Sequence, residues 1–429
     1  RSEAQLNMPL RGMWVGTFHG LAHRFLRAHW QDANLDQNFQ ILDADDQLRM
    51  VRRVMVSLDI DEKKWPPRQS VWWINAQKDD GLRAAHIHDQ GDVFVQVQLR
   101  VYRAYEEACE RGGLVDFAEL LLRMHETLLN RPELLAHYQR RFKAILVDEF
   151  QDTNALQYAW LRVLAGNSSH VMVVGDDDQS IYGWRGAKIE NIQRFERDFK
   201  ATSVFRLEQN YRSTANILQA ANGLIEKNAD RLGKSLWTAD AEGERIGLYA
   251  AYNEIDESRF IVARIQDSFN GGEALSEHAI LYRSNAQSRV LEEGLLRAQI
   301  PYRIYGGQRF FERAEIRTAL AYLRLLSSRD SDAAFERVVN VPPRGIGDKS
   351  IGLLRDFARE KQLSLWQAAT ELCAHDALPG RAQRAVAAFL STIDTLDEST
   401  DQFDLPSLVE TVIDAMGLKS HYEIGRAHV

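Results

Sequence analysis

The sequence predicts an α/β protein, in which short buried strands alternate with amphipathic helices. Two β-branched apolar runs, at 145–147 and 171–174, are too short for buried helices, and each is followed closely by acidic residues. The residues from 18 to 141 show helical periodicity instead. Because parallel strands end at a shared carboxyl edge, where α/β sheets bind ligands, both acidic ends are expected at one such edge.

The expected elements begin with a short strand at 13–17, and helices follow it. Together these helices form an all-α insertion of about 125 residues between two strands of one sheet, which is the size of a domain. Its tryptophans, Trp65, Trp72 and Trp73, are interpreted as core and hinge residues rather than nucleic-acid contacts. The helices and the break between them are predicted from a Leu-Asp cap at 42–43, a Trp-Pro-Pro sequence at 65–67, and helical periodicity at 71–78, 93–111 and 117–129.

A second α/β unit is predicted from residue 209 onward. Strand-like runs at 246–251, 278–282 and 302–305 alternate with expected helices at 256–269 and 286–299. Alternation at this length implies a second parallel sheet. Beyond residue 305 the pattern is mostly helical and carries no strand signal.

Composition and charge exclude several classes of protein. With 429 residues, the chain exceeds a single core, and roughly two to four domains are expected. The net charge of −8 argues against binding nucleic acid mainly by bulk charge, although local basic grooves and base stacking can still hold single strands. Cys109 and Cys373 stand far apart without metal spacing, which fits a reducing cytoplasm. No apolar run reaches the about 18 residues of a membrane span, so no membrane partner is expected.

The first apolar run ends in two adjacent carboxylates, Asp148 and Glu149. Magnesium-nucleotide chemistry needs two different acids at such a strand end, one to hold Mg²⁺ and one to orient or deprotonate an attacking water. Asp148 is predicted as the metal ligand and Glu149 as the base. For this pair alone, a solvated acidic turn is the simpler interpretation, and the stretches that follow reverse that preference.

The second run leads into a glycine-flanked stretch, 175–187, that carries Gln179, Tyr182, Trp184 and Arg185. These side chains are too large, too polar and too irregularly spaced for a core. We therefore interpret the stretch as a binding loop.

Three long motifs follow one another in order: DEFQD at 148–152, VGDDDQSIYGWRGA at 174–187 and LEQNYRST at 207–214. The last ends in Ser-Thr, an expected helix N-cap pair. These motifs resemble motifs II, III and IV of superfamily 1 DNA helicases of the UvrD/Rep family, and GTFHGLAH at 16–23 strengthens the resemblance. The match extends from about residue 12 to about residue 424.

The resemblance implies two RecA-like parallel-sheet lobes, both incomplete, with two mostly helical inserted domains. Residues 425–429, Gly-Arg-Ala-His-Val, look like a translated sequencing adapter and are expected to be an artefactual tail. The implied division is 1–17 with 143–208 for the first lobe (1A), 18–142 for its helical insertion (1B), 209–305 for the second lobe (2A) and 306–424 for its insertion (2B).

The resemblance also implies ATP and Mg²⁺ as cofactors and assigns roles around them. Asp148 would hold Mg²⁺, and Glu149 would activate water. Gln179 would sense the γ-phosphate, Arg212 would act as an arginine finger, and Tyr211 would stack near the adenine.

Two groups of residues are expected to contact DNA. Gly345 and Gly347 lie in a Gly-apolar-Gly turn before a helix, which places backbone N–H groups and a helix N-terminus where a duplex phosphate can bind. A plain helix-loop-helix corner, in which the glycines only permit φ > 0, explains this turn equally well. The residues expected to contact single-stranded DNA are Thr17, His19, Tyr182, Trp184 and Arg185.

The implied function is an ATP-dependent 3′–5′ DNA helicase or translocase of DNA repair and replication, located in the cytoplasm. Its partners would be single-stranded DNA, single-strand/duplex junctions and repair proteins. Two alternatives stay open: a non-hydrolysing DNA-binding or partner-docking protein of the same fold, and a helicase-nuclease subunit. An upstream phosphate loop would separate the first alternative from a helicase, and a C-terminal metal-nuclease domain would identify the second.

The sequence contains no phosphate-cradling Gly-x-x-x-x-Gly-Lys-Ser/Thr loop. The Gly-Lys-Ser at 233–235 has Asn228 where the first glycine is required and follows a helical segment, so it is interpreted as a surface turn. The family's loop is expected before residue 1, and its motifs V and VI beyond residue 429. The chain is therefore expected to be an internal fragment that does not itself hydrolyse ATP at a useful rate.

Overall fold

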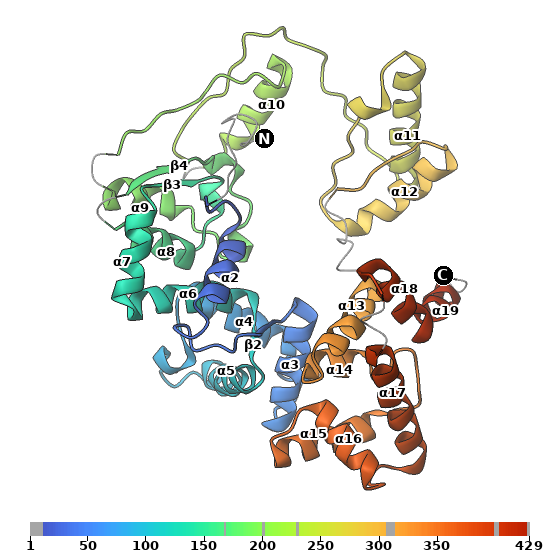
Figure 1. The fold of residues 1–429 in the computed structure, drawn as a ribbon. Helices are drawn as coiled ribbons and strands as arrows, with labels where there is room; N and C mark the ends of the chain where they lie inside the picture. Colours follow the sequence, from blue (N-terminus) through green and yellow to red (C-terminus); the bar gives the residue numbers. More distant parts are fainter. Residues whose placement is uncertain are drawn as a thin grey trace. The chain divides into compact units, whose positions relative to one another are not determined.

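The computed structural model describes residues 12–166, 169–199, 202–228, 231–305, 314–398 and 403–426. The chain forms two compact units, Arg1–Ile246 and Gly247–Val429 (Figure 1). The described part of the first contains the long helical region and two short parallel sheets, whereas the described part of the second contains helices and no strand. Within the described ranges, no helix combines the length and the apolar character needed to cross a bilayer.

Helices fill residues 18 to 141, as predicted, and polar side chains fix where several of them begin. Asp43, Asp92 and Asp116 each accept backbone N–H groups from the first turn of the helix that follows. The predicted break at 65–67 is present, but Pro67 is itself the first helical residue, since that position needs no N–H partner. The helices are α2 (Phe18–Ala28), α3 (Ala44–Ser57), α4 (Pro67–Asp79), the 3-10 turn η1 (Ala84–His86), α5 (Val93–Arg111), α6 (Phe117–Asn130) and α7 (Pro132–Arg141).

A network of buried charges lies within this helical region. Lys78 is only 2 % exposed, and its Nζ lies 2.7 Å from Asp116 Oδ2 and 3.0 Å from Glu119 Oε2. Arg83 donates to both carboxylate oxygens of Glu119, at 2.7 Å each. Burial alone would raise the pKa of Glu119, but the charges of Lys78 and Arg83 hold that pKa well below its usual range. Glu119 is therefore ionised and paired inside the folded domain.

In this region the structure differs from the sequence-based expectations at three points. The strand predicted at 13–17 is wrong: these residues form a loop, because the Trp14 ring packs edge-on against the side chains of α7 and Thr17 becomes the N-cap of α2. Trp65 and Trp73 pack against the core as expected, whereas Trp72 is 73 % exposed and is not a core residue. A short parallel pair, too short to show alternation in sequence, joins β1 (Gln40–Ile41) to β2 (Leu114–Val115).

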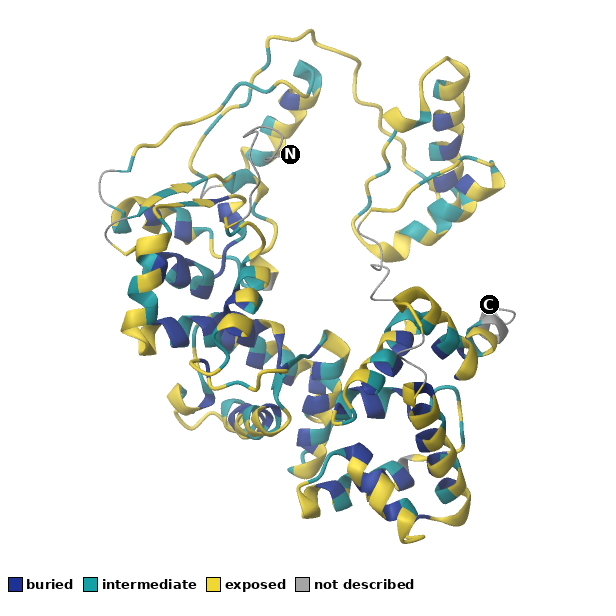
Figure 2. Ribbon diagram, viewed as in Figure 1, coloured by how far each residue is buried: buried dark blue, intermediate teal, exposed yellow. Residues whose placement is uncertain are grey.

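The two predicted acid-bearing strands pair in parallel and in register, with Val147 opposite Val173. One side of this sheet is packed against two helices through a core that includes Phe150 and Phe195. The other side is open, since Leu146 is 74 % exposed (Figure 2). The elements are β3 (Ala144–Val147), the 3-10 turn η2 (Phe150–Asp152), α8 (Ala155–Ala165), β4 (His170–Val173), the 3-10 turns η3 (Asp177–Gln179) and η4 (Gly183–Arg185), and α9 (Glu190–Asp198).

Residues 202–305 contain fewer regular elements than the sequence predicts. The helices expected at 256–269 and 286–299 are present, and α10 follows the predicted N-cap pair. The strands predicted at 246–251, 278–282 and 302–305 are wrong: each segment is irregular and finds no strand partner among the described residues. Leu248 and Leu281 are 98 % and 94 % exposed as a result, and the described residues form no second parallel sheet in this region. The elements are α10 (Ala215–Ile225), α11 (Glu254–Asn270), η5 (Leu275–Glu277), η6 (Asn285–Gln287) and α12 (Ser288–Arg297).

The remaining described residues form a helical domain, as predicted for the region after 306; residues 306–313 and 427–429 lie outside the described part. Its core includes Tyr322, Phe335 and Phe389, and the Phe389 ring contacts the rings of the other two. The helices are α13 (Ala314–Ser327), α14 (Asp332–Val338), α15 (Asp348–Lys361), α16 (Leu365–Ala374), α17 (Gly380–Glu398), α18 (Leu405–Ala415) and α19 (Leu418–Arg426).

Asp79, the last residue of α4, gives the fold a testable pH dependence. Its Oδ1 accepts a 2.8 Å hydrogen bond from Asn154 Nδ2, and burial, together with the charges of Asp80 and Asp116, raises the pKa of Asp79 to about 7. The folded protein then retains a proton that the unfolded chain releases from about pH 4 upward, so stability falls as the pH rises toward 7. Asp79→Asn removes this penalty and keeps the acceptor. We expect it to raise the free energy of unfolding by about 4 kcal/mol at pH 8 and by less than half as much at pH 5.

Urea unfolding of the 429-residue chain at the two pH values measures this difference. Asp240→Asn, at an exposed position, is the matched control and should change stability equally at both pH values. A gain for Asp79→Asn that is the same at pH 5 and pH 8 would contradict the raised pKa.

Candidate functional site

The acid pair lies where the sequence predicts it, at the carboxyl edge of the parallel sheet. Asp148 and Glu149 directly follow β3, and both are exposed. Phe150 is buried in the core beneath the sheet, and its N–H donates to Val174 O at 2.9 Å, which continues the pairing beyond both strands. Glu149 has φ +50°, in the left-handed region that non-glycine residues rarely adopt. Such strain is tolerated where the surrounding structure holds a functional side chain in place.

The Gln151 side chain links the acid loop, residues 148–152, to the neighbouring loop that begins at Gly175. Its Nε2 donates to Glu149 Oε2 at 2.7 Å, while its Oε1 accepts the N–H of Asp176 at 3.0 Å. The side chain is only 1 % exposed. Gly175 is needed beside it, because a Cβ there would lie 2.8 Å from the same Oε1. Sequence reasoning missed Gln151, although a glutamine directly after a buried aromatic in an acidic loop is a signal that could have found it.

Asp148 provides a carboxylate suited to a magnesium ion. Its Oδ1 accepts the N–H of Glu149 at 3.0 Å, which fixes the orientation of the group, and the carboxylate faces solvent. Mg²⁺ keeps several of its waters and takes one or two protein carboxylates together with substrate phosphates. A single oriented, exposed carboxylate at the strand end fits that requirement.

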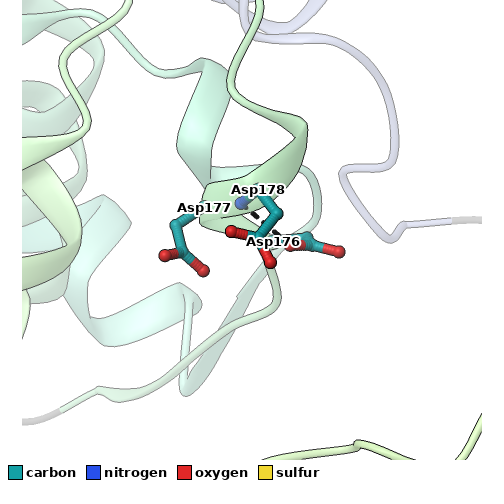
Figure 3. Close-up of side chains that lie close together, drawn as sticks. All are labelled: Asp176, Asp177 and Asp178. Carbon is teal, nitrogen blue, oxygen red and sulfur yellow. Dashed lines mark hydrogen bonds between the residues drawn. The ribbon is translucent and has the colours of Figure 1, made fainter. Parts of the chain in front are cut away.

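The three aspartates that begin the second motif lie close together but are already paired. Figure 3 shows Asp176, Asp177 and Asp178 at η3, with the N–H of Asp178 donating to Asp176 at 3.0 Å. Arg231 donates to both oxygens of Asp178, at 3.0 and 2.7 Å, and Lys234 pairs with Asp176. Although burial opposes it, the bonds from Lys234 and Gln179 lower the pKa of Asp176. Protein cations therefore offset two of the three negative charges, which makes the cluster a poor metal site.

Lys234 belongs to the Gly-Lys-Ser that the sequence suggested was a surface turn. The turn is present, since Gly233 has φ +73° and no helix follows, so this is not a phosphate loop. The lysine side chain, however, is only 17 % exposed and is committed to Asp176. Sequence reasoning missed both Lys234 and Arg231, whose partners lie more than 50 residues away along the chain.

Gln179 is exposed at the end of η3, and its Nε2 donates to Asp176 Oδ2 at 2.7 Å. The binding loop that follows is exposed rather than core, as predicted. Trp184 is 71 % exposed and lies 6.5 Å from the Tyr182 ring between centroids. Gly186 ends the loop with φ +85°. The side chain of Arg185 lies outside the described part of the structure.

Thr17 and His19 begin α2 and have local structural partners. Thr17 is the N-cap, and its Oγ1 accepts the N–H of Gly20 at 3.2 Å. The His19 ring lies edge-on to Phe117 of α6, with 6.1 Å between centroids, and burial lowers the pKa of His19. The imidazole is therefore neutral at physiological pH, and any DNA contact it makes would be without charge.

Tyr211 and Arg212 lie in a loop before α10, and both are exposed. Asn210 organises this loop, since its Oδ1 accepts the N–H groups of Arg212 and Ser213, at 2.8 Å each. Thr214 is the N-cap by position, as predicted, but its side chain makes no capping hydrogen bond. The backbone of the loop is thus held internally, and the Arg212 side chain is exposed.

The turn at 345–347 has the features of a structural corner, and a helix begins directly after it. Gly345 has φ +81°, which favours glycine, and Ile346 between the glycines is fully buried. Asn340 Oδ1 accepts the N–H groups of Arg344 and Ile346, so the turn is fixed from within. Gly347 is the N-cap of the 14-residue helix α15, which has no side-chain cap. The corner is structural, and the helix N-terminus that it presents suits an anion.

Comparisons with known proteins agree with this geometry. The model of the UvrD/REP helicase N-terminal domain matches residues 1–200, and that of the UvrD-like helicase C-terminal domain matches residues 205–422. The chain belongs to the UvrD/Rep helicase family. This confirms the family that the three motifs predict, with the acid pair in the first matched domain and the 345–347 turn in the second.

Individual UvrD/Rep-family relatives match almost the whole chain. DNA helicase II of Escherichia coli is 61 % identical over 412 residues, or 96 % of this chain, and DNA helicase II of Haemophilus influenzae is 54 % identical over 414 residues. The ATP-dependent DNA helicase PcrA of Staphylococcus epidermidis is 37 % identical over 408 residues. The chain spans 57 % of the length of the first two relatives and 56 % of the third.

Proposed function

We propose that the protein carrying this chain is an ATP-dependent DNA helicase that moves 3′ to 5′ on single strands and acts in DNA repair and replication. The single observation that carries the proposal is the hydrogen-bonded link, through Gln151, between the acid pair and the loop that presents Trp184. A helicase must couple nucleotide turnover to DNA binding. The hydrogen bonds of Gln151 join the sheet edge that carries Asp148 and Glu149 to a loop with an exposed tryptophan ring, on which a base can stack. The names of the relatives, DNA helicase II and ATP-dependent DNA helicase PcrA, support the same assignment.

The acid pair divides the hydrolytic work. Asp148 would hold the Mg²⁺ that neutralises charge on the β- and γ-phosphates when nucleotide is bound. Glu149 would orient and deprotonate the attacking water, and its hydrogen bond from Gln151 fixes the direction of the carboxylate. Gln179, held by Asp176, would sense the γ-phosphate.

The loop at 209–214 would complete the nucleotide site. Arg212 would donate its guanidinium to the phosphoryl group as charge develops there, and the exposed Tyr211 ring would stack near the adenine. We propose Arg212 as the arginine finger because Asn210 holds the backbone of Arg212 while its side chain faces solvent.

For DNA, we propose that Tyr182, Trp184 and Arg185 bind single strands, together with Thr17 and His19 at the start of α2. Trp184 offers the largest exposed ring face in the loop. Base stacking on such a ring is tolerant of sequence and needs no basic surface, which is consistent with the net charge of −8.

Trp184→Ala in the intact protein tests the single-strand site. Loss of one stacking platform should weaken binding of oligo-dT by about 5- to 150-fold, which corresponds to about 1–3 kcal/mol per base. Because the ring is 71 % exposed, the melting temperature should change little. Fluorescence anisotropy of labelled oligo-dT measures the affinity, and Trp72→Ala, at an equally exposed tryptophan on α4, is the control. Loss of folded protein with unchanged affinity of the folded fraction would make Trp184 a structural residue.

The helix N-terminus at Gly347 is proposed as a contact for duplex phosphate. Gly347→Ala tests it cleanly, since a Cβ there meets nothing within 4 Å and the residue has φ −82°. Gly345→Ala would be strained by φ +81° in any case, so it cannot separate the two interpretations. We expect Gly347→Ala to slow unwinding of a tailed duplex by roughly threefold or more while sparing ATPase activity stimulated by single strands. Equal loss of both activities would indicate a folding role for Gly347.

A further inference from the structure

Three residues between 231 and 234 donate to the aspartate cluster, and each of them binds a different aspartate carboxylate. Arg231 donates to both oxygens of Asp178, and the N–H of Leu232 donates to Asp177 Oδ2 at 2.7 Å. Lys234 pairs with Asp176. The four charged side chains are between 14 % and 24 % exposed. A bidentate, partly desolvated arginine–carboxylate pair fixes geometry better than an exposed ion pair does.

Hydrogen bonds connect Asp176 to the proposed catalytic residues, directly to Gln179 and through Gln151 to Glu149. The carboxylate of Asp176 accepts the amide of Gln179 at 2.7 Å, so Lys234 and Gln179 share one acceptor group. The backbone N–H of Asp176 donates to Gln151, which in turn donates to Glu149. A displacement of Asp176 would therefore change the position of both Gln179 and Glu149.

The other end of the same segment is tied to the Arg212 loop. Asn222 of α10 donates to Leu236 O at 2.8 Å and accepts the N–H of Leu236. Trp237 then pairs with the backbone at 208–210, donating to Glu208 O at 3.1 Å and accepting from Asn210 at 2.7 Å. Asn210 is the residue that holds Arg212.

We propose that Arg231 and Lys234 form an ionic latch: they are positioning residues that set Gln179 and Glu149 relative to Arg212 without touching the nucleotide. The catalytic part of this inference rests on the proposed function. The latch transmits movement of the 208–212 backbone to the acid loop through Asp176, so hydrolysis becomes sensitive to the position of the arginine.

The test compares Lys234→Met, Lys234→Arg and Asp176→Asn in the intact protein. Lys234→Met should lower the DNA-stimulated kcat for ATP by roughly tenfold while leaving the KM for ATP within about twofold, because coupling residues act at this scale without contacting the ligand. Lys234→Arg should restore most of the activity. Lys234→Met combined with Asp176→Asn should be no worse than the worse single variant. Lys227→Met, at an exposed lysine after α10, is the matched control.

A charge swap tests the other half of the latch independently of catalysis. Arg231→Asp should increase hydrogen exchange of the amides at 176–179, and adding Asp178→Arg should restore their protection. An unchanged kcat in Lys234→Met, or full additivity with Asp176→Asn, would overturn the latch. If the parent protein shows no DNA-stimulated ATPase activity, the proposed function fails, and the hydrogen-exchange measurement alone then tests the latch. Unchanged protection of the amides at 176–179 in Arg231→Asp would refute the latch. Restored protection in the charge-swapped double variant would support it.

Discussion

Replacing Glu149 with glutamine is expected to reduce DNA-stimulated ATP turnover by about 10²- to 10⁴-fold, the range that a positioned general base contributes. Glutamine has nearly the same shape and can still accept the hydrogen bond from Gln151, so it removes the base without disturbing the loop. The KM for ATP should therefore stay close to that of the parent. Steady-state turnover of Mg-ATP by the intact protein, with saturating oligo-dT, measures the effect.

Glu226→Gln, at the exposed end of α10, provides the control for this substitution and should leave turnover unchanged. If Glu149→Gln turns over ATP within a few-fold of the parent rate, Glu149 is not the base. The acid pair would then be a solvated acidic turn, which is the simpler interpretation of an Asp-Glu pair taken alone. The 429-residue chain by itself contains no phosphate-cradling loop, so we expect its turnover to resemble that of the Glu149→Gln protein.

Arg212→Ala is expected to lower kcat by about 10³- to 10⁵-fold if the residue acts as an arginine finger. Arg212→Lys should recover little of this loss, since an ammonium cannot reproduce the planar two-donor geometry of a guanidinium. Stopped-flow binding of a fluorescent ATP analogue separates lost affinity from lost turnover. Arg206→Ala, at an exposed arginine in the preceding segment, is the matched control. Full activity in Arg212→Lys, or an equal loss in Arg206→Ala, would show that Arg212 contributes only general positive charge.

Local signals in the sequence predict the helical part of this fold well. Helix α5 begins and ends where the periodicity at 93–111 places it, because Asp92 caps its start and the apolar spacing persists to its end. The acid-bearing strands are also predicted, since their apolar runs and acidic ends are adjacent in the chain. The runs near 248, 281 and 303 look the same locally, yet they form no strand, because pairing depends on a neighbour that a local pattern cannot supply.

The candidate site divides in the same way. The exposed positions of Asp148, Glu149 and Trp184 could be predicted, since each lies in a short stretch whose composition is unlike that of a core. Arg231 and Lys234 could not, because an arginine or lysine in a turn carries no local sign of a partner at 176–178. For the same reason the sequence suggested a solvated Gly-Lys-Ser turn, whereas the folded chain places its lysine against an aspartate.

The buried charges of the helical region constrain how this protein can evolve. Losing Lys78 would remove the cation that pairs with the buried Asp116, at a cost of about 3–5 kcal/mol, which is a large share of the net stability of a domain. Glu119 would still be paired with Arg83. Replacing Lys78 and Asp116 together with apolar side chains of similar volume would cost less than losing Lys78 alone. Among natural variants of this chain, positions 78 and 116 should therefore be inherited or exchanged together.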